Sequence, residues 1–267
     1  MNDITIGYLS WNNHNKFLET LISHSENSLF NYIPPQNRII FFQEITDRDK
    51  DIATTFNCRY IGNNSNIGIL YAFIELVEAC NTKYFIFCEN DFILMKQNEL
   101  YIDKTLHDVV SILDTILYAQ IKLSNSKNPG FLYITPSDIK AWIKNDNTGF
   151  RYKIESLSWI DNPEIYYPTM QSIHKNYKWL MCNNDDQLWS NHIYACNTKF
   201  LKEIIVPILK FNCKINPTLD IKYQGLEDTL ANINQMLGKD PSIDKLIEEY
   251  KKRIILSGGG NFFHKKY

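Results

Sequence analysis

The fold of this chain is decided by the segment Tyr84-Phe-Ile-Phe-Cys-Glu-Asn-Asp91, in which an apolar run leads directly into two carboxylates. An apolar run of this length predicts a buried strand. Side chains two residues apart on an extended segment share a side, so Glu89 and Asp91 can face one point beyond the strand. Two hard oxygen ligands in that position suit Mg²⁺ or Mn²⁺ bridging a diphosphate. The alternative is an acidic turn that binds nothing.

Apolar runs and helical patterns alternate before this segment. The pattern predicts buried strands at residues 4–9, 38–42, 58–61 and 84–88, and helices at 17–22, 47–56 and 67–80. Such alternation is typical of βαβ units, so we expect an α/β fold with a mostly parallel sheet flanked by helices. Ligands of open α/β sheets lie at the carboxyl ends of the strands. The polar residues that follow the strands therefore form the candidate site: 10–13, 43–44 and 89–91.

The second part of the chain is less regular. We expect helices at residues 103–123, 199–209 and 242–253, strands at 131–135, 154–159 and 188–196, and a flexible loop at 257–261. There is no internal repeat and no clean linker, which favours a single domain over residues 1–267.

Composition excludes several classes of protein. The 28 basic and 30 acidic side chains give a net charge of −2, which argues against a nucleic-acid partner. Six cysteines occur without a CxxC pair, so a zinc ribbon is not expected. The N-terminus lacks the pattern of a signal peptide, and no apolar stretch reaches about 18 residues. We expect a cytoplasmic protein without a transmembrane segment, and a peripheral membrane association stays open.

Several segments resemble those of family-2-like glycosyltransferases with a GT-A fold, and they occur along the chain in the order of that family. The Glu89-Asn90-Asp91 segment is similar to the DXD-type motif of that family. The other segments that carry the resemblance are Ser10-Trp11-Asn12 after the first strand, Asn66-Ile67-Gly68 before the donor-site helix, Gly225-Leu226-Glu227-Asp228 on the acceptor side, and the C-terminal His264. The resemblance covers residues 4–95 and two later islands. It implies a nucleotide-sugar-binding half at 1–95 and an acceptor half with a closing tail at 96–267.

The resemblance also implies roles for individual residues. Asp91 and His264 would bind the metal, Mn²⁺ or Mg²⁺; Asp228 would be the catalytic base, and Glu227 would orient the acceptor hydroxyl. The nucleotide-sugar, most simply a UDP-sugar, would be bound by Ser10, Trp11, Glu44, Asn66, Gly68, Glu89 and Asn90. The acceptor would be a glycan, a protein or a small molecule, and transfer would proceed with inversion.

The sequence departs from the family pattern at two places. The first acid of the DXD-type motif is Glu89 and not aspartate, so its longer arm could reach either the ribose or the metal. The loop after the second strand lacks the common Asp-Gly-Ser-x-Asp pattern and offers Gln43-Glu44 instead. We expect Glu44 to accept a hydrogen bond from the base, with Gln43 as the alternative.

Each candidate also has a plainer interpretation. His264 could belong to an exposed basic tail, and Glu227-Asp228 could simply be the acidic start of a helix. Residues 183–186 with Trp179 and Trp189 could form an acceptor wall, although a loop with two core tryptophans is the commoner arrangement.

Two other functions compete with sugar transfer. A sugar nucleotidyltransferase would need a glycine-rich phosphate loop after the first strand, and Tyr8 to Asn12 contains no glycine. A catalytically inactive sugar- or nucleotide-binding module is the other alternative, and the carboxylates present at both acidic motifs argue against it.

Overall fold

A nine-stranded sheet runs through the part of the chain that the computed structural model describes, which is residues 1–96, 99–123, 170–184, 189, 192–216 and 225–257, with the backbone of 262–264. In spatial order its strands are β3 (Arg59–Asn63), β2 (Arg38–Gln43), β1 (Ile4–Trp11), β4 (Tyr84–Glu89), β9 (Tyr194–Asn197), β6 (Ala119–Lys122), β10 (Ile254–Ser257), β8 (Lys178–Asn183) and β7 (Gln171–His174). A separate two-stranded sheet pairs β5 (Phe92–Leu94) with β11 (Phe262–His264).

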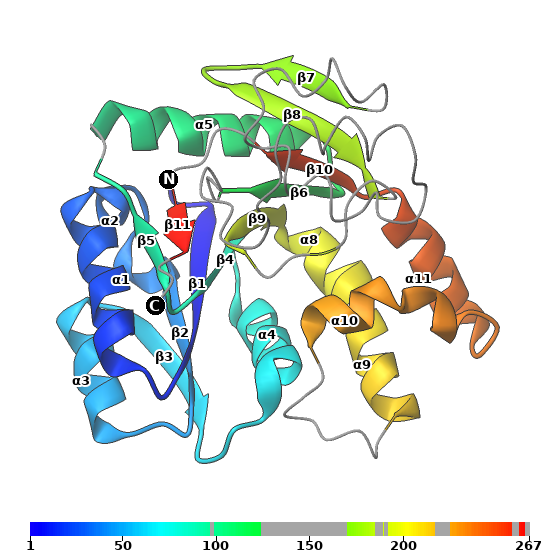
Figure 1. Cartoon of the computed structure of the whole chain (residues 1–267), viewed down its shortest axis with the longest axis horizontal. Coiled ribbons are helices and arrows are strands. Elements are labelled where there is room, and N and C mark those ends of the chain that lie inside the picture. The colour runs from blue at the N-terminus through cyan, green and yellow to red at the C-terminus, as the bar shows by residue number, and fades with distance from the viewer. Residues whose placement is uncertain are drawn as a thin grey trace, which may run out of the picture.

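Helices cover both faces of the large sheet (Figure 1). They are α1 (His14–Glu26), α2 (Leu29–Tyr32), α3 (Asp47–Thr55), α4 (Gly68–Ala79), α5 (Glu99–Thr115), α8 (Thr198–Phe200), α9 (Val206–Ile215), α10 (Leu226–Ala231) and α11 (Pro241–Lys251). A π-helical segment at Leu201–Ile205 joins α8 to α9. None of the helices in the described residues has both the length and the apolar character needed to cross a membrane.

The parallel part of the sheet brings the predicted ligand edge together. The four strands β3, β2, β1 and β4 all run parallel, and β8 and β9 oppose the direction of the other strands of this sheet. In the register of β1, Leu9 lies beside Glu89 and Trp11 lies beside Gln43. The ends of β1, β2 and β4 therefore meet at one edge. The prediction of an α/β fold with a mostly parallel, helix-flanked sheet is confirmed.

The strands are apolar on both faces because each face has its own helical cover. Ile6 and Tyr8 of β1 pack with α1, α3 and α5 in one core, whereas Leu9 packs with α4, α9 and α11 in the other. Gly7 lies under the ring of Phe85, where an added Cβ would come within 2.5 Å of a ring carbon. Because Gly7 has no side chain, β1 leaves room for the ring of Phe85, which belongs to the neighbouring strand β4.

Several predicted elements of the second half differ in the structure. The single helix expected at 103–123 is wrong, because α5 ends at Thr115 and the chain then enters β6 between β9 and β10. The strand expected at 188–196 begins only at Tyr194, since the described residues 192 and 193 form a bend, and the helix expected at 242–253 ends at Lys251 and gives way to β10. Short apolar segments fit a helix or a strand equally well, and pairing with distant strands decides between them. The strands expected at 131–135 and 154–159 lie outside the described residues.

The β7–β8 hairpin is held on α5 by one buried carboxylate. Asp108 accepts hydrogen bonds from the backbone N–H groups of Asn176 and Tyr177, each at 3.0 Å, and from the indole of Trp179 at 2.9 Å. A buried N–H group without an acceptor destabilises the fold. Asp108 alone provides the acceptors for the N–H groups of the turn and of the indole.

Helix α1 fastens the short strand β5 through a buried histidine. His24 Nε2 lies 2.9 Å from the carbonyl oxygen of Phe92, which can only accept, so Nε2 carries the proton. Its Nδ1 then accepts from the hydroxyl of Tyr8 at 2.7 Å. Ser23 Oγ accepts from the backbone N–H of Leu94 at 3.1 Å. Burial lowers the pKa of His24 to about 4, so the ring is neutral near pH 7.

The buried neutral His24 makes the fold sensitive to acid. The unfolded chain binds a proton near the ordinary pKa of about 6.5, whereas the folded chain does so only near 4, so stability falls as the pH drops between these values. We expect the free energy of unfolding to fall by about 2–3 kcal/mol between pH 7 and pH 4.5. Urea denaturation at both pH values measures this loss. In His24→Gln the loss should shrink, and in the matched control His107→Gln, an exposed histidine of α5, it should persist; equal losses in both variants would count against this assignment.

Candidate functional site

The loops that follow β1 and β2 are joined by a tryptophan and a carboxylate. Trp11 Nε1 donates a hydrogen bond to Glu44 Oε2 at 2.9 Å. Asn12 and Glu44 both have left-handed backbones, with φ of 48° and 54°, a conformation that costs non-glycine residues about 1–3 kcal/mol. Trp11 is nevertheless 52% exposed. A large aromatic face held at this edge can stack on a planar ligand. Ser10, predicted beside it, is buried within β1.

Gln43 organises the loop that precedes α4. Its side-chain Nε2 donates to the carbonyl of Gly68 at 2.9 Å, and its Oε1 accepts from the backbone N–H of Ile67 at 2.8 Å. Asn66 Oδ1 accepts from the N–H of Gly68 at 2.8 Å, and Gly68 takes the positive φ of 80° that glycine tolerates. Gln43 is buried and engaged at both ends of its amide, which leaves Glu44 as the exposed acid of this loop. Asn66 likewise uses its side-chain oxygen to shape the loop.

Carboxylates from two distant parts of the chain gather at the end of β4. Burial, and to a lesser extent the nearby charges of Asp91 and Glu227, together raise the pKa of Glu89 to about 8. Asp91 Oδ2 accepts from Lys16 Nζ at 3.3 Å. Glu227 comes from the first turn of α10. The structure thus brings the Glu89–Asp91 and Gly-x-Glu-Asp segments into one electrostatic neighbourhood.

The start of α10 sets the position of Asp228. Its Oδ2 folds back over Gly225, only 2.8 Å from where a Cβ of residue 225 would lie. Asn212 of α9 donates to the hydroxyl of Thr229 at 3.4 Å, which ties the two helices together. The absence of a side chain at position 225 therefore makes room for this carboxylate.

The C-terminal strand reaches the same region. In the β5–β11 pair, the backbone of His264 is in register with Phe92, the residue that follows Asp91. The side chain of His264 lies outside the described part of the chain. Within the described residues, no group of three His, Cys, Asp or Glu side chains is arranged to hold a metal ion. The donor atoms present are nevertheless carboxylate oxygens, which hard divalent cations prefer.

The proposed acceptor wall is wrong in its tryptophans. Trp179 and Trp189 are both buried in the core, Trp179 on Asp108 and Trp189 edge-on against Tyr194. The neighbouring Asp185 and Asp186 lie outside the described residues. The plainer interpretation, a loop with core tryptophans, accounts for both indoles.

Sequence inspection missed two residues of α1 that contact the acidic loop. Lys16 donates to Asp91, and Thr20 Oγ1 donates to the carbonyl of Asn90 at 3.0 Å. These residues are four apart and therefore share one face of the helix. The signal that could have found them is a second polar stripe on α1 beside its apolar one.

Comparisons with known proteins bear on the fold. No protein-family model and no curated protein matches the sequence. The structure resembles that of residues 1–349 of S. aureus TarS, with a TM-score of 0.51 and 11% identity over 99% of this chain and 60% of that one. It also matches a mannosyltransferase from Pyrobaculum calidifontis in complex with GDP-Man and Mn²⁺, with a TM-score of 0.43 and 10% identity over 75% of this chain and 46% of that one. The chain thus spans less than two thirds of the length of either. The TarS match supports the GT-A assignment of the fold.

The raised pKa of Glu89 gives a testable dependence of stability on pH. The folded chain keeps a proton up to about pH 8 that the unfolded chain releases near its ordinary pKa, so stability falls as the pH rises between these values. In EDTA at pH 9, we expect Glu89→Gln to be more stable than the wild type by up to about 4 kcal/mol, with no gain at pH 4. Thermal or urea unfolding measures this difference. The exposed Glu248→Gln is the control, and a Glu89→Gln gain that does not change with pH would refute the explanation.

Proposed function

We propose that this protein is a metal-dependent glycosyltransferase that moves a sugar from a nucleoside-diphosphate donor, with a UDP-sugar as the expected donor, to an acceptor hydroxyl with inversion. The observation that carries the proposal is the meeting of Glu89, Asp91 and Glu227 at the carboxyl edge of the parallel strands. Ligands of open α/β sheets bind at this edge. The family-2-like resemblance of the same segments supports this reading.

The nucleotide would bind across the ends of β1 and β2. Trp11 offers an exposed aromatic face for the base, and Glu44 lies beside it at hydrogen-bonding distance from the indole. The loop at Asn66–Gly68, held by Gln43, would border the donor from the side of α4. The Trp11–Glu44 hydrogen bond and the left-handed backbones of Asn12 and Glu44 suggest a rigid, preorganised wall.

Asp91 and His264 are the residues that would hold the metal, Mn²⁺ or Mg²⁺, beside the diphosphate of the donor. The β5–β11 register supports this pairing, because it holds the backbone of His264 next to the residue after Asp91. The bound cation would neutralise the charge that develops on the leaving diphosphate. Asn90 and Glu89 would line the same pocket towards the ribose and the donor sugar.

Asp228 is the proposed base that takes the proton of the attacking acceptor hydroxyl, and Glu227 would orient that hydroxyl. Both residues lie in the first turn of α10, where the helix dipole favours negative charge. Glu227 is close enough to Glu89 for its charge to raise the pKa of Glu89, and this proximity would place the acceptor beside the donor sugar. The acceptor would be a glycan, a protein or a small molecule.

Exchange of Asp91 tests the metal-dependent activity directly. In Asp91→Ala we expect at least a 100-fold loss of Mn²⁺-dependent donor hydrolysis and transfer, because a ligand of the cation is gone. Release of each nucleoside diphosphate from a panel of sugar nucleotides provides the assay, and calorimetry with UDP, with and without Mn²⁺, reports binding. The exposed Asp51→Asn is the matched control. Full activity of Asp91→Ala would refute the assignment, and UDP binding without any link to Mn²⁺ would favour an inactive binding module.

Gly225→Ala tests the position of the proposed base without removing it. The new methyl group would lie 2.8 Å from Asp228 Oδ2, and the flexible carboxylate would have to move aside. We expect a loss of kcat of about 10–100-fold, since small displacements of a catalytic group are costly. The melting temperature should stay close to that of the wild type, and Mn²⁺-linked UDP binding should be retained. Asp228→Asn should give the same pattern with a larger loss; unchanged turnover in both variants would exclude Asp228 as the base.

A further inference from the structure

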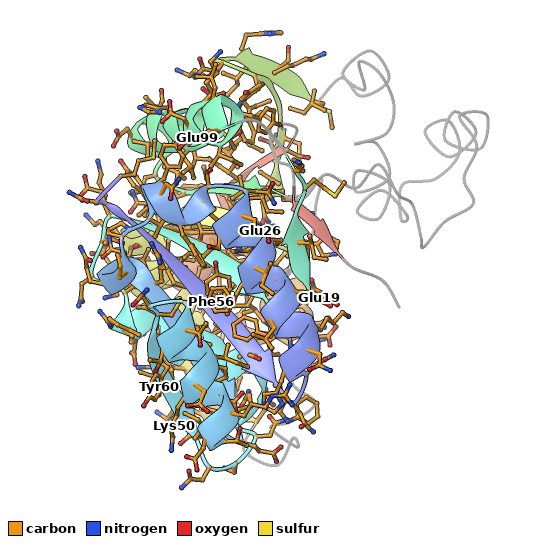
Figure 2. All side chains as sticks on the ribbon, turned by 90° about the vertical axis from the view of Figure 1, so that its left-hand side faces the viewer. Glu19, Glu26, Lys50, Phe56, Tyr60 and Glu99 are labelled. Atoms are coloured by element: carbon orange, nitrogen blue, oxygen red, sulfur yellow. The ribbon has the colours of Figure 1, made fainter. Side chains whose placement is uncertain are left out.

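A buried polar face of α1 holds the loop that carries Asp91. Lys16 Nζ lies 3.3 Å from Asp91 Oδ2, and one turn later Thr20 donates to the carbonyl of Asn90. Figure 2 shows α1, with Glu19 labelled on it, running alongside β5 and β11. Lys16 thus projects from the same helix face that fastens this loop to the rest of the molecule.

The Lys16–Asp91 ion pair is largely shielded from solvent. The side chains of Lys16 and Asp91 are 11% and 15% exposed. Charges this far from water interact more strongly than surface pairs, and removing one partner leaves a poorly solvated charge. Asp91 also shares its surroundings with Glu89 and Glu227. A positive group beside Asp91 therefore offsets repulsion that the carboxylates would otherwise exert on one another.

A divalent cation on Asp91 would compete with this ammonium. Metal and ammonium would both approach the same carboxylate, and two positive charges at this separation repel each other. Lysine has a flexible four-carbon stem and three donors, and it binds phosphate as a point charge. A diphosphate bound beside Asp91 would offer Lys16 a second anionic partner.

We propose that Lys16 is a positioning residue of the donor site: its ammonium holds Asp91 while no divalent cation is bound, and it turns to the diphosphate of the donor when the cation replaces it. This inference rests on the proposed glycosyltransferase function. It predicts opposite effects on two ligands. Removal of the ammonium should strengthen the binding of metal in the absence of nucleotide, because it removes a competitor for Asp91. It should weaken the binding of the nucleotide, because it removes a contact to the diphosphate.

The test uses the full chain and two separate titrations. Mn²⁺ binding without nucleotide is followed by electron paramagnetic resonance of free Mn²⁺, and UDP binding at saturating Mn²⁺ is followed by calorimetry. In Lys16→Met we expect the Kd for Mn²⁺ to fall about tenfold and the Kd for UDP to rise about tenfold. Lys16→Arg, which keeps the charge, should bind Mn²⁺ as the wild type does. Lys251→Met removes the lysine of an exposed ion pair on α11 and should change neither titration.

The possible results separate this inference from the function on which it rests. Wild-type protein without Mn²⁺-linked UDP binding would overturn the proposed function itself. If the wild type shows such binding but Lys16→Met binds Mn²⁺ and UDP as the wild type does, or binds both more weakly, only the proposed movement of Lys16 from Asp91 to the diphosphate is overturned. If Lys16→Met lacks a native circular dichroism spectrum, Lys16→Gln takes its place. Retention of the opposed shifts in Lys16→Arg would show that charge is not their cause and would also refute the exchange.

Discussion

Mutual repulsion among carboxylates at the end of β4 is the constraint that the surrounding structure has to meet. Burial raises the pKa of Glu89, and the charges of Asp91 and Glu227 add to this effect, so that the pKa reaches about 8. Such a cluster opposes folding unless positive or hydrogen-bonding groups offset it. Lys16 supplies an ammonium beside Asp91, and Thr20 binds the carbonyl of Asn90 between the two acids. The protein's own groups therefore offset part of the negative charge of this cluster, and a bound cation would offset more of it.

Helix α1 carries most of these supports, and it does so by burying polar side chains. Thr20, Ser23 and His24 are all buried, although an ordinary surface helix buries only its apolar stripe. Each of the three has a hydrogen-bond partner in or beside residues 90–94. Polar groups that are buried and satisfied specify one geometry, because any shift of the helix would leave several of them unpaired. The loop with Asp91 is thereby fixed relative to the sheet.

The first half of the fold could be predicted from the sequence because its signals are local. The run from Tyr84 to Cys88 and its counterparts in β1 and β2 are apolar on both faces, and helical patterns separate them. The short strands of the second half could not be predicted, since β6 and β10 each span four residues and become strands only by pairing with distant partners. Local pattern does not contain that information.

The same distinction between local patterns and distant contacts decides which residues of the candidate site could be predicted. The acids at 89 and 91 could be singled out from the sequence because they lie at and just beyond the end of a strand, and those at 227 and 228 because their segment resembles a known motif. The sequence could not decide whether Glu44 or Gln43 is available to a ligand. Only the structure shows that the Gln43 side chain is hydrogen-bonded to the loop at Ile67 and Gly68. A polar stripe on α1 could have drawn attention to Lys16, but the sequence could not pair it with Asp91, which lies 75 residues away. Residues that position a site through contacts with distant parts of the chain cannot be identified from local sequence patterns.

The small β5–β11 sheet connects these supports to the C-terminal tail. A two-stranded sheet is only marginally stable by itself. Here β5 is anchored to α1 through the carbonyls of Phe92 and Leu94, and β11 in turn has β5 as its paired strand in the described chain. Because Phe92 accepts from His24 on one side and lies in register with His264 on the other, α1 and the tail meet across a single strand. Strand β11 is therefore connected to helix α1 through β5, although the two are separated by nearly the whole length of the chain.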